Sequence, residues 1–253
     1  MKPVVVRRIA RVDGETIRLL GELGVATVHE AQGRRGLMRP YMRPVYPSAR
    51  LSGSAVTVWC QPGDNLMIHA AMEVVAPGDV LVVATTSESD DGMFGELLGE
   101  SCRAHGVVGL AIDAGVRDTS ELTAMNFPVW AKAISAQGTV KVTAGCVNVE
   151  VVCAGALVRP GDVIVGDRDG VVVVPRQAAV EVARLGGERR AKEECSRARL
   201  KSGELGLDIY GLRGKLAELG VEWVESEESL AVNPPAIDSR RSPFVFSGRT
   251  VRL

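Results

Sequence analysis

Short runs of consecutive apolar residues constrain the fold of this chain more than any other feature. A strand with one face in water alternates apolar and polar residues, whereas an uninterrupted apolar run predicts a strand that is covered on both faces. Such runs occupy residues 80–83, 107–112, 163–165 and 171–174. Helical patterns separate some of them, at residues 66–75, 96–104 and 120–125. We therefore expect a layered α/β or α+β architecture.

The composition of the 253-residue chain narrows the class of protein. It is 46% hydrophobic and 24% charged but only 4% aromatic, so valine, alanine and leucine must fill the core. A formal charge of −1 gives no sign of the basic face that nucleic-acid binding requires, so no nucleic-acid partner is expected. No apolar run reaches the roughly 20 residues needed to cross a bilayer, so no membrane association is expected. Five cysteines without a C-x-x-C pair predict reduced, buried thiols in a cytoplasmic protein.

Capping residues and turns mark the remaining elements of the first two thirds of the chain. Asp13 is predicted to cap a first helix, and a second helix is expected over residues 25–32. The triplet Pro-Gly-Asp begins at Pro62, Pro77 and Pro160. It predicts a helix cap in the first case and entry into a strand in the other two. Further strands are expected at residues 55–59, 128–133, 139–142 and 148–152.

The C-terminal part of the chain has a helical pattern followed by a polar segment. Apolar residues spaced three or four apart predict an apolar stripe on one helix face, which docks on its own core or on a neighbouring subunit. These residues are Leu205, Ile209, Leu212, Leu216 and Leu219. After Glu225 the sequence turns polar and contains prolines, so residues 225–253 are expected to form an arm that is either intersubunit or disordered.

The stretch 109–121 is the most informative for chemistry, because it predicts a strand, a glycine turn and then a helix. Active sites in layered α/β proteins favour the carboxyl ends of strands. Arg117 can bind a carboxylate bidentately, and Asp118 offers a hard oxygen to a divalent cation that keeps several waters. Together they suit a 2-oxo acid. The alternatives are that Asp118 caps the following helix, with Glu121 three residues on, and that Arg117 is a surface arginine.

A second candidate segment covers residues 92–99, where glycines precede a helical pattern. Backbone N–H groups at a helix start bind anions, and Glu96 could orient a water or transfer a proton. The alternative is a glycine turn followed by an exposed glutamate. Asn65 either donates to a substrate or begins a helix, and His69 would lie on the same helix face, although such a histidine is more often a packed residue. No P-loop, nucleophile elbow, histidine metal motif or strand-linked dinucleotide fingerprint is present.

Several separated motifs, in the same order, resemble one known family. They are GELL at residues 95–98, DAGVRD at 113–118, FPVWAKAISAQG at 127–138, DVIVGDRDGVVVVP at 162–175 and GELGLDIY at 203–210. The chain resembles the 4-hydroxy-4-methyl-2-oxoglutarate / 4-carboxy-4-hydroxy-2-oxoadipate aldolases over roughly residues 15–224. The regulators of ribonuclease E activity share the fold of that family. The resemblance implies an α/β fold, an RraA-like layered β/β/α sandwich of the swivelling-domain type with C-terminal helices, within a domain at 1–224.

The resemblance also implies a divalent-metal aldolase of class II. In the family, an acidic residue, twenty intervening residues and then Arg-Asp mark the aldolases, and here Glu96 precedes Arg117 and Asp118 with that spacing. The familiar version has aspartate at the first position, so glutamate places its carboxylate one methylene further out. The ribonuclease regulators lack this acid, and its presence favours an enzyme.

Site residues carry over from the family position by position. Gly95, Glu96, Leu97 and Leu98 would supply backbone contacts to substrate, Arg117 would bind the pyruvyl group, and Asp118 would bind Mg²⁺ or Mn²⁺. Asn65 matches a substrate-side asparagine. Glu193 matches an acid that reaches a neighbour's metal water, a role that Glu194 could serve instead. Family members assemble as homotrimers or homohexamers with sites between subunits.

The implied reaction converts 4-carboxy-4-hydroxy-2-oxoadipate or 4-hydroxy-4-methyl-2-oxoglutarate into pyruvate plus oxaloacetate or a second pyruvate. The metal and Arg117 would stabilise a pyruvate enolate, and Glu96 would hold the water that moves the protons. The same chemistry permits oxaloacetate decarboxylation. The rival hypotheses are a non-catalytic protein-binding regulator of the ribonuclease E type and a lyase or decarboxylase for another 2-oxo acid.

Overall fold

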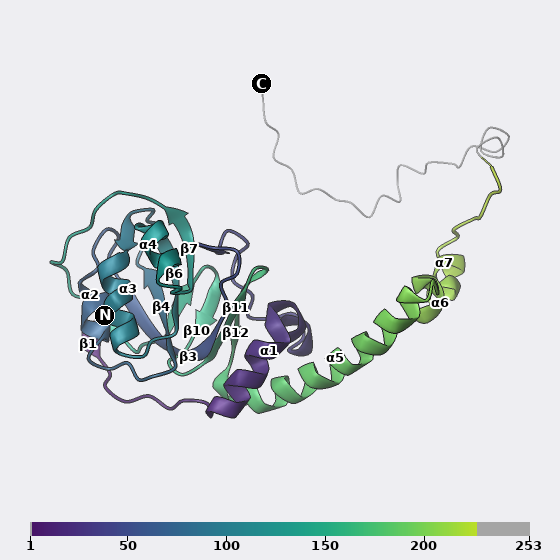
Figure 1. Cartoon of the computed structure of the whole chain (residues 1–253), viewed down its shortest axis with the longest axis horizontal. Coiled ribbons are helices and arrows are strands. Elements are labelled where there is room, and N and C mark those ends of the chain that lie inside the picture. The colour runs from purple at the N-terminus through teal and green to yellow at the C-terminus, as the bar shows by residue number, and fades with distance from the viewer. Residues whose placement is uncertain (1, 227–253) are drawn as a thin grey trace, which may run out of the picture. The chain divides into compact units, whose positions relative to one another are not determined.

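The computed structural model describes residues 2–226 and divides the chain into two compact units, Met1–Cys195 and Ser196–Leu253. The first unit is built on a ten-stranded mixed sheet (Figure 1). Its centre consists of four parallel strands in the order β3, β4, β6 and β7. These strands are β3 (Leu51–Cys60), β4 (Asp79–Thr85), β6 (Gly109–Val116) and β7 (Val129–Ile134). Strands β1 (Val4–Val5) and β8 (Cys146–Val147) extend the sheet beyond β3, and β2 (Arg43–Pro44) extends it beyond β7. Strand β5 (Gly92–Phe94) pairs with β6.

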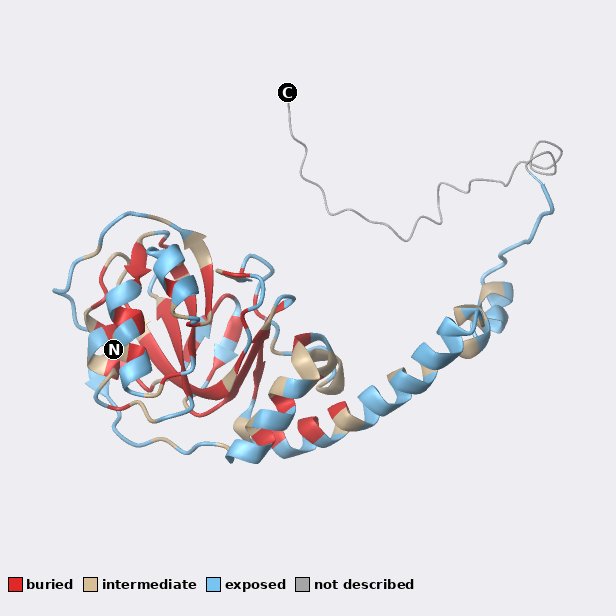
Figure 2. Cartoon of the chain, in the orientation of Figure 1, coloured by how far each residue is buried: buried red, intermediate tan, exposed pale blue. Residues whose placement is uncertain are grey.

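The central strands are buried on both faces, as their continuous apolar runs predict. In β4, Leu81 and Val83 belong to one core cluster, whereas Val80 and Val82 belong to another. Figure 2 shows these strands as largely buried. Three helices contribute to the first cluster and cover that face of the sheet. They are α2 (Leu66–Ala71), α3 (Glu96–Ala104) and α4 (Thr119–Ala124).

The opposite face of the sheet is covered by more β structure. Strand β11 (Val163–Asp167) pairs antiparallel with β12 (Gly170–Val174) and with β3. A two-stranded sheet, β9 (Val151–Cys153) and β10 (Ala156–Val158), contributes to the core cluster that contains Val80 and Val82 of β4. Side chains of α1 (Gly14–Ala31) and of the start of α5 (Ala179–Lys201) form a third cluster with β11 and β12. This layering confirms the expected α/β class.

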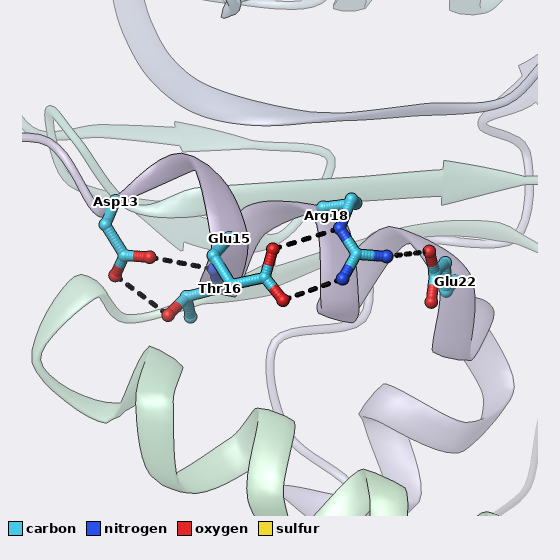
Figure 3. A network of polar contacts seen from close by, with 5 residues as sticks. All are labelled: Asp13, Glu15, Thr16, Arg18 and Glu22. Atoms are coloured by element: carbon cyan, nitrogen blue, oxygen red, sulfur yellow. Dashed lines mark hydrogen bonds and ion pairs between the residues drawn. The ribbon is translucent and has the colours of Figure 1, made fainter.

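Helix α1 begins where the sequence predicts, at an aspartate cap. The Asp13 carboxylate accepts hydrogen bonds from the Thr16 amide (2.9 Å) and from the Thr16 hydroxyl (2.8 Å) (Figure 3). In the same figure Arg18 lies between Glu15 and Glu22 and pairs with both. Gly24 interrupts the helix with φ 79° and ψ 166°, which divides it into the two helical segments that the pattern indicates.

Two predicted strands are wrong. Residues 139–142 form no strand, because only Val140 makes an isolated bridge, to Asp64, and the surrounding segment bonds to loop backbone instead. Residues 148–152 do not form one strand either. Asn148 adopts a left-handed φ of 58°, and this turn separates β8 from β9.

The C-terminal helical pattern also differs from the prediction. The apolar stripe from Leu205 to Leu219 does not lie on one helix, because the chain forms α6 (Gly206–Ile209) and α7 (Arg213–Glu218) on either side of Gly211, whose φ is 63°. Cys195 is exposed rather than buried, whereas the other four cysteines are buried, and none of the five forms a disulfide. A single 3₁₀ turn (Arg176–Ala178) precedes α5. Residues 227–253 of the predicted arm lie outside the described part, and the expected domain limit at 224 stays a prediction.

Within residues 2–226, no helix combines the length and apolar character needed to cross a membrane.

An ion pair holds the segment before α1 against the sheet. Arg11 donates to the Asp79 carboxylate from Nε (2.8 Å) and from Nη2 (2.7 Å), and the Ala76 amide donates to the same carboxylate at 2.7 Å. The Asp79 side chain is 1% exposed. This carboxylate stands in the Pro-Gly-Asp triplet that begins at Pro77, and β4 starts at Asp79, as predicted.

Replacing Arg11 by methionine is expected to lower the free energy of unfolding by about 2 kcal/mol, because the buried Asp79 carboxylate loses its cation. Arg7→Met is the matched control. The pair between Arg7 and Glu73 is exposed on both sides, and such pairs contribute little. Urea denaturation at pH 7 measures both variants, and equal stabilities would contradict the anchoring role of Arg11.

Candidate active site

A cavity of about 350 Å³ lies beyond the carboxyl ends of β3 and β6, at the start of α3. Its lining includes seven of the eight site residues that the sequence predicts, from three separate segments. These seven are Asn65, Gly95, Glu96, Leu97, Leu98, Arg117 and Asp118. Parallel strands place their carboxyl ends at one edge of a sheet, which explains why loops far apart in sequence meet here.

The Asp118 side chain bonds to the start of α3 instead of capping its own helix. Asp118 has a left-handed backbone (φ 52°, ψ 43°), and its side chain makes no capping hydrogen bond to α4. Its Oδ2 accepts a hydrogen bond of 3.0 Å from the Glu96 amide and lies 3.6 Å from Arg117 Nε. The alternative that Asp118 is a side-chain cap of the following helix is therefore wrong.

Gly95 makes this contact possible through its lack of a side chain. Its backbone is extended (φ −155°, ψ −165°), a conformation open to any residue. A Cβ at this position would lie 2.3 Å from Asp118 Oδ2 and 3.0 Å from Arg117 Cγ. The requirement for glycine is therefore one of space, and it allows the Asp118 carboxylate to approach the α3 terminus.

The backbone of Arg117 is fixed, whereas its side chain is about half exposed at the cavity. The Arg117 amide donates to the Phe94 carbonyl (2.9 Å), which ties the end of β6 to β5. The side chain, 47% exposed, keeps its guanidinium available to a ligand while it lies near Asp118. A planar guanidinium in this position can bind a carboxylate with two parallel hydrogen bonds.

Asn65 and His69 line the cavity from the segment around α2. Asn65 is buried, and its Nδ2 donates to the Met93 carbonyl at 3.0 Å. Its buried Oδ1 has no hydrogen-bond partner among residues 2–226. His69 is exposed rather than packed, four residues later on the same face. Although His69 is exposed, the partial desolvation of its ring at the cavity wall, and secondarily the charge of Lys141, lower its pKa below the usual 6.5.

Asp64 fixes the loop that closes one side of the cavity. Its buried carboxylate accepts hydrogen bonds from the amides of Leu66 (2.9 Å), Val142 (2.9 Å) and Thr143 (2.7 Å). Burial by itself would raise the pKa of Asp64, but these amides outweigh it and hold the pKa below the usual 3.8. The predicted role of the first Pro-Gly-Asp triplet is met only in part: the N-cap of α2 is Asn65, which makes no side-chain capping bond, and Asp64, one residue earlier, accepts from the first helical amide, that of Leu66.

Sequence reasoning missed two further residues that line the cavity, Lys141 and the side chain of Glu121. Lys141 stands in the segment predicted as a strand, and no local pattern indicates that this segment folds over a site. For Glu121 the sequence predicts only a part in a helix-capping pattern. Leu97, predicted to contribute its backbone, has a side chain that is 81% exposed.

Glu193 is the one predicted site residue that does not line this cavity. It lies on α5 and pairs with Arg189 at 2.8 Å. The resemblance assigns its role to a neighbouring subunit, so this role stays a prediction.

The residues present fit a divalent cation that keeps most of its waters. Within residues 2–226, no group of three or more histidine, cysteine, aspartate or glutamate side chains is arranged to hold a metal. Asp118 offers its Oδ1, which has no hydrogen-bond partner in the described part of the chain. Mg²⁺ is typically held by one or two carboxylates plus substrate and water. Asp118 is therefore the residue that would hold such an ion.

The fold and the site together define a layered α/β protein with an arginine, a carboxylate and a helix N-terminus around one cavity. The RraA-like family, described as Aldolase/RraA, matches residues 25–173, more than half of the chain. The chain belongs to this RraA-like family, as the motifs predict.

Individual relatives are consistent with this assignment. A protein of Halalkalibacterium halodurans with the provisional name 4-hydroxy-4-methyl-2-oxoglutarate aldolase is 29% identical over 169 residues, which cover 67% of this chain and 80% of that protein. Streptomyces coelicolor RraAS2, described as an unusual member of the RNase ES inhibitor RraA protein family, has a similar crystal structure. Its TM-score is 0.68 at 29% identity, covering 75% of this chain and 99% of that one. An uncharacterized Pseudomonas syringae protein reaches a TM-score of 0.71 at 25% identity, covering 80% and 96%.

Asp64→Asn is expected to lower the free energy of unfolding by about 2 kcal/mol at pH 7, because a charged acceptor of three amides becomes neutral. The folded pKa of Asp64 is lowered, so this contribution is fully present above the ordinary pKa of 3.8 and is lost as the pH falls through the folded value. The difference between wild type and variant should therefore shrink on acidification. Denaturant titrations from pH 7 to pH 2.5 measure it, and a difference independent of pH would contradict the assignment.

Proposed function

We propose that this chain is a divalent-metal-dependent aldolase that releases pyruvate from 4-hydroxy-2-oxo acids with additional carboxylates. Candidate substrates are 4-carboxy-4-hydroxy-2-oxoadipate and 4-hydroxy-4-methyl-2-oxoglutarate. The observation that carries the proposal is the meeting of the Arg117 and Asp118 side chains with the N-terminus of α3 around one cavity. The provisional name of the Halalkalibacterium halodurans relative supports it.

The substrate's pyruvyl end is bound by two kinds of donor. Arg117 pairs with the C1 carboxylate through its guanidinium. The first amides of a helix have no acceptor within the helix, and Asp118 occupies that of Glu96. The amides of Leu97 and Leu98 therefore remain to donate to substrate oxygens, where the helix dipole also favours negative charge.

The charges around the cavity support a metal requirement. Three carboxylates, those of Glu96, Asp118 and Glu121, line it beside the two cations of Arg117 and Lys141. An anionic substrate would enter a site that already carries an excess of negative charge, unless a cation compensates it. Mg²⁺ or Mn²⁺ held by Asp118 would supply this charge and polarise the substrate's C2 carbonyl.

The residues of the chain then remove one proton from the substrate and add one proton to the product. Glu96, through a water that it holds, accepts the proton of the C4 hydroxyl. The C3–C4 bond breaks, the C4 carbon becomes a carbonyl, and the bonding electrons form the pyruvate enolate. Arg117 stabilises the developing negative charge. The protonated Glu96–water pair returns the proton to C3, and pyruvate leaves together with oxaloacetate or a second pyruvate. Oxaloacetate decarboxylation, which forms the same enolate, is an expected side activity.

A neighbouring subunit would complete the site. We propose a homotrimer or homohexamer in which Glu193 of one copy reaches the cavity of the next, where its carboxylate would hold water. Glu193 is half-buried, and its carboxylate pairs with Arg189 of its own helix, so reaching a neighbouring cavity would require it to leave this pair.

A non-catalytic regulator is the second candidate, and one finding favours it. Streptomyces coelicolor RraAS2, with a closely similar fold, is described as a member of an RNase inhibitor family. Glu96 weighs against this reading, because a regulator needs no carboxylate twenty-one residues before an Arg-Asp pair. A lyase or decarboxylase acting on another 2-oxo acid is the third candidate.

Pyruvate release from 4-carboxy-4-hydroxy-2-oxoadipate tests the proposal directly. A coupled lactate dehydrogenase assay measures it with Mg²⁺ present and after chelation. Rapid release that stops on chelation and returns with added metal is expected. The absence of release from folded, metal-supplied protein would overturn the aldolase proposal in favour of the regulator, whereas release from oxaloacetate alone would favour a dedicated decarboxylase.

Arg117→Ala and Asp118→Ala are each expected to reduce kcat/KM by about 10³-fold or more, because each removes charge stabilisation at the enolate. Glu96→Gln should reduce kcat by about 10²- to 10⁴-fold through the loss of proton transfer. Arg103→Ala is the control, since this arginine is exposed on α3 and does not line the cavity. Retention of most activity in the Arg117 or Asp118 variant, with the control unaffected, would refute their roles.

A further inference from the structure

A cavity of about 380 Å³ in the first unit is lined by three arginines and shares no residue with the candidate active site. Arg8 belongs to the segment between β1 and α1, Arg159 to the loop between β10 and β11, and Arg176 to the 3₁₀ turn before α5. The fold therefore brings cations from three separate parts of the sequence to one cavity. Its volume lies in the range of small-molecule sites.

One buried carboxylate orders the backbone that carries two of these arginines. Asp162 is 2% exposed, and its two oxygens accept hydrogen bonds from the amides of Arg159 (2.9 Å) and Arg176 (3.0 Å). Beside it, Gly161 has a φ of 84°, and a Cβ there would lie 1.9 Å from the Ala10 carbonyl oxygen. The wall of the cavity is thus held by backbone contacts, so a ligand does not have to order it on binding.

Asn148 fixes the segment that carries the third arginine. It lines the cavity, it is 4% exposed, and its amide donates to the Thr57 carbonyl of β3 at 2.8 Å. Its Nδ2 donates to the Val6 carbonyl (2.8 Å), and the Val6 amide donates to the Val147 carbonyl (3.1 Å). Arg8 therefore follows a backbone position that is bonded on both sides.

Two of the three guanidinium groups have no counter-charge. Among the described residues that line the cavity, only Glu150 is acidic, and it pairs with Arg159 at 2.7 Å. The oxygens of Asp162 are occupied by the two amides. Arg8 and Arg176 make no ion pair with any of residues 2–226. An excess of positive charge in a concave, ordered site attracts anions, although the formal charge of the whole chain is −1.

The apolar part of the lining narrows the class of anion. It consists of Val6, Ile9, Ala10 and Pro160. An inorganic anion would leave this surface in contact with water, whereas the body of an organic acid would cover it. A guanidinium binds a carboxylate through two parallel hydrogen bonds, and its flat face stacks on aromatic rings. The lining therefore favours a flat, apolar carboxylic acid.

We propose that this cavity binds an aromatic carboxylate, which pairs with Arg8 and Arg176 while its ring covers the apolar part of the lining. The inference goes beyond the proposed function and does not depend on it, because no residue of the active site takes part. Each of the two arginines should contribute about tenfold to the affinity, the factor expected for a hydrogen bond between charged groups.

Ligand-observed ¹⁹F NMR with 4-fluorobenzoate tests the proposal on the full chain without added metal. The probe signal should broaden when protein is added, and an excess of benzoate should restore it. Benzamide has the same shape without the charge, and acetate has the charge without the ring, so each should compete at least about tenfold more weakly. No broadening with the wild type would overturn the proposal, and competition by inorganic phosphate as strong as that by benzoate would overturn the assignment to an organic acid.

Variants place the probe in this cavity. Arg8→Met and Arg176→Met should each weaken probe binding by about tenfold. Neither side chain is hydrogen-bonded within residues 2–226, so both variants should keep the thermal unfolding midpoint of the wild type. Arg7→Met is the matched control, because Arg7 precedes Arg8, pairs with Glu73 and does not line the cavity.

Arg117→Ala separates this cavity from the active site, which also contains an arginine suited to carboxylates. This variant should bind the probe as tightly as the wild type does. Unchanged binding in both Arg8→Met and Arg176→Met, or loss of binding in Arg117→Ala, would overturn the proposal. Equal weakening in Arg7→Met would show only a general effect of surface charge and would also contradict it.

Discussion

The hydrogen bond from the Glu96 amide to the Asp118 carboxylate is the contact on which the arrangement of the site depends. It joins the start of α3 to the end of β6, two segments separated by twenty-one residues in sequence. It requires Gly95, because any side chain there would displace the carboxylate. With one oxygen fixed in this way, Asp118 keeps its other oxygen for a ligand, and Arg117 is held beside it. The anion-binding start of α3 and the carboxylate that would bind a cation therefore lie next to each other.

The buried parallel sheet holds the two residues of this contact in fixed positions. The strands β3, β4 and β6 pack between α2, α3 and α4 on one face and further β structure on the other, so their carboxyl ends have little freedom. Close approach of backbones reinforces the edge. A Cβ at Gly115 would lie 2.1 Å from the Asp90 carbonyl oxygen, which shows how tightly the segment before β5 packs on β6. The side chains that would act in the reaction are exposed, whereas the backbone segments that carry them are held in place by this packing.

The sequence predicted the features that depend on local pattern. Apolar runs identified the central strands, Asp13 identified the start of α1, and the motifs identified seven residues that share one cavity. The errors arose where tertiary contacts decide the structure. The residue type of Asp118 left open the alternative of a side-chain helix cap, which its left-handed backbone excludes by directing the carboxylate to α3. Gly211 breaks an apolar stripe that otherwise reads as one helix.

Lys141 shows a second reason why part of the site could not be predicted from the sequence. The loop that carries it has no periodicity, and it is ordered by the buried carboxylate of Asp64 and by backbone hydrogen bonds to the same segment, more than seventy residues earlier in the chain. A pattern of residue types contains no signal for such a contact. The same is true of the role proposed for Glu193, because it depends on a second copy of the chain rather than on its own neighbours.

A crystal structure of the protein with Mn²⁺ and pyruvate tests the central claim most directly, namely that Asp118 and Arg117 form one site for a metal and a 2-oxo acid. Anomalous scattering locates the Mn²⁺ independently of the protein coordinates. The account predicts an anomalous peak at the Asp118 carboxylate, with the pyruvate carboxylate paired to Arg117 at the start of α3. Mn²⁺ bound at other carboxylates, or pyruvate bound away from Arg117, would contradict it.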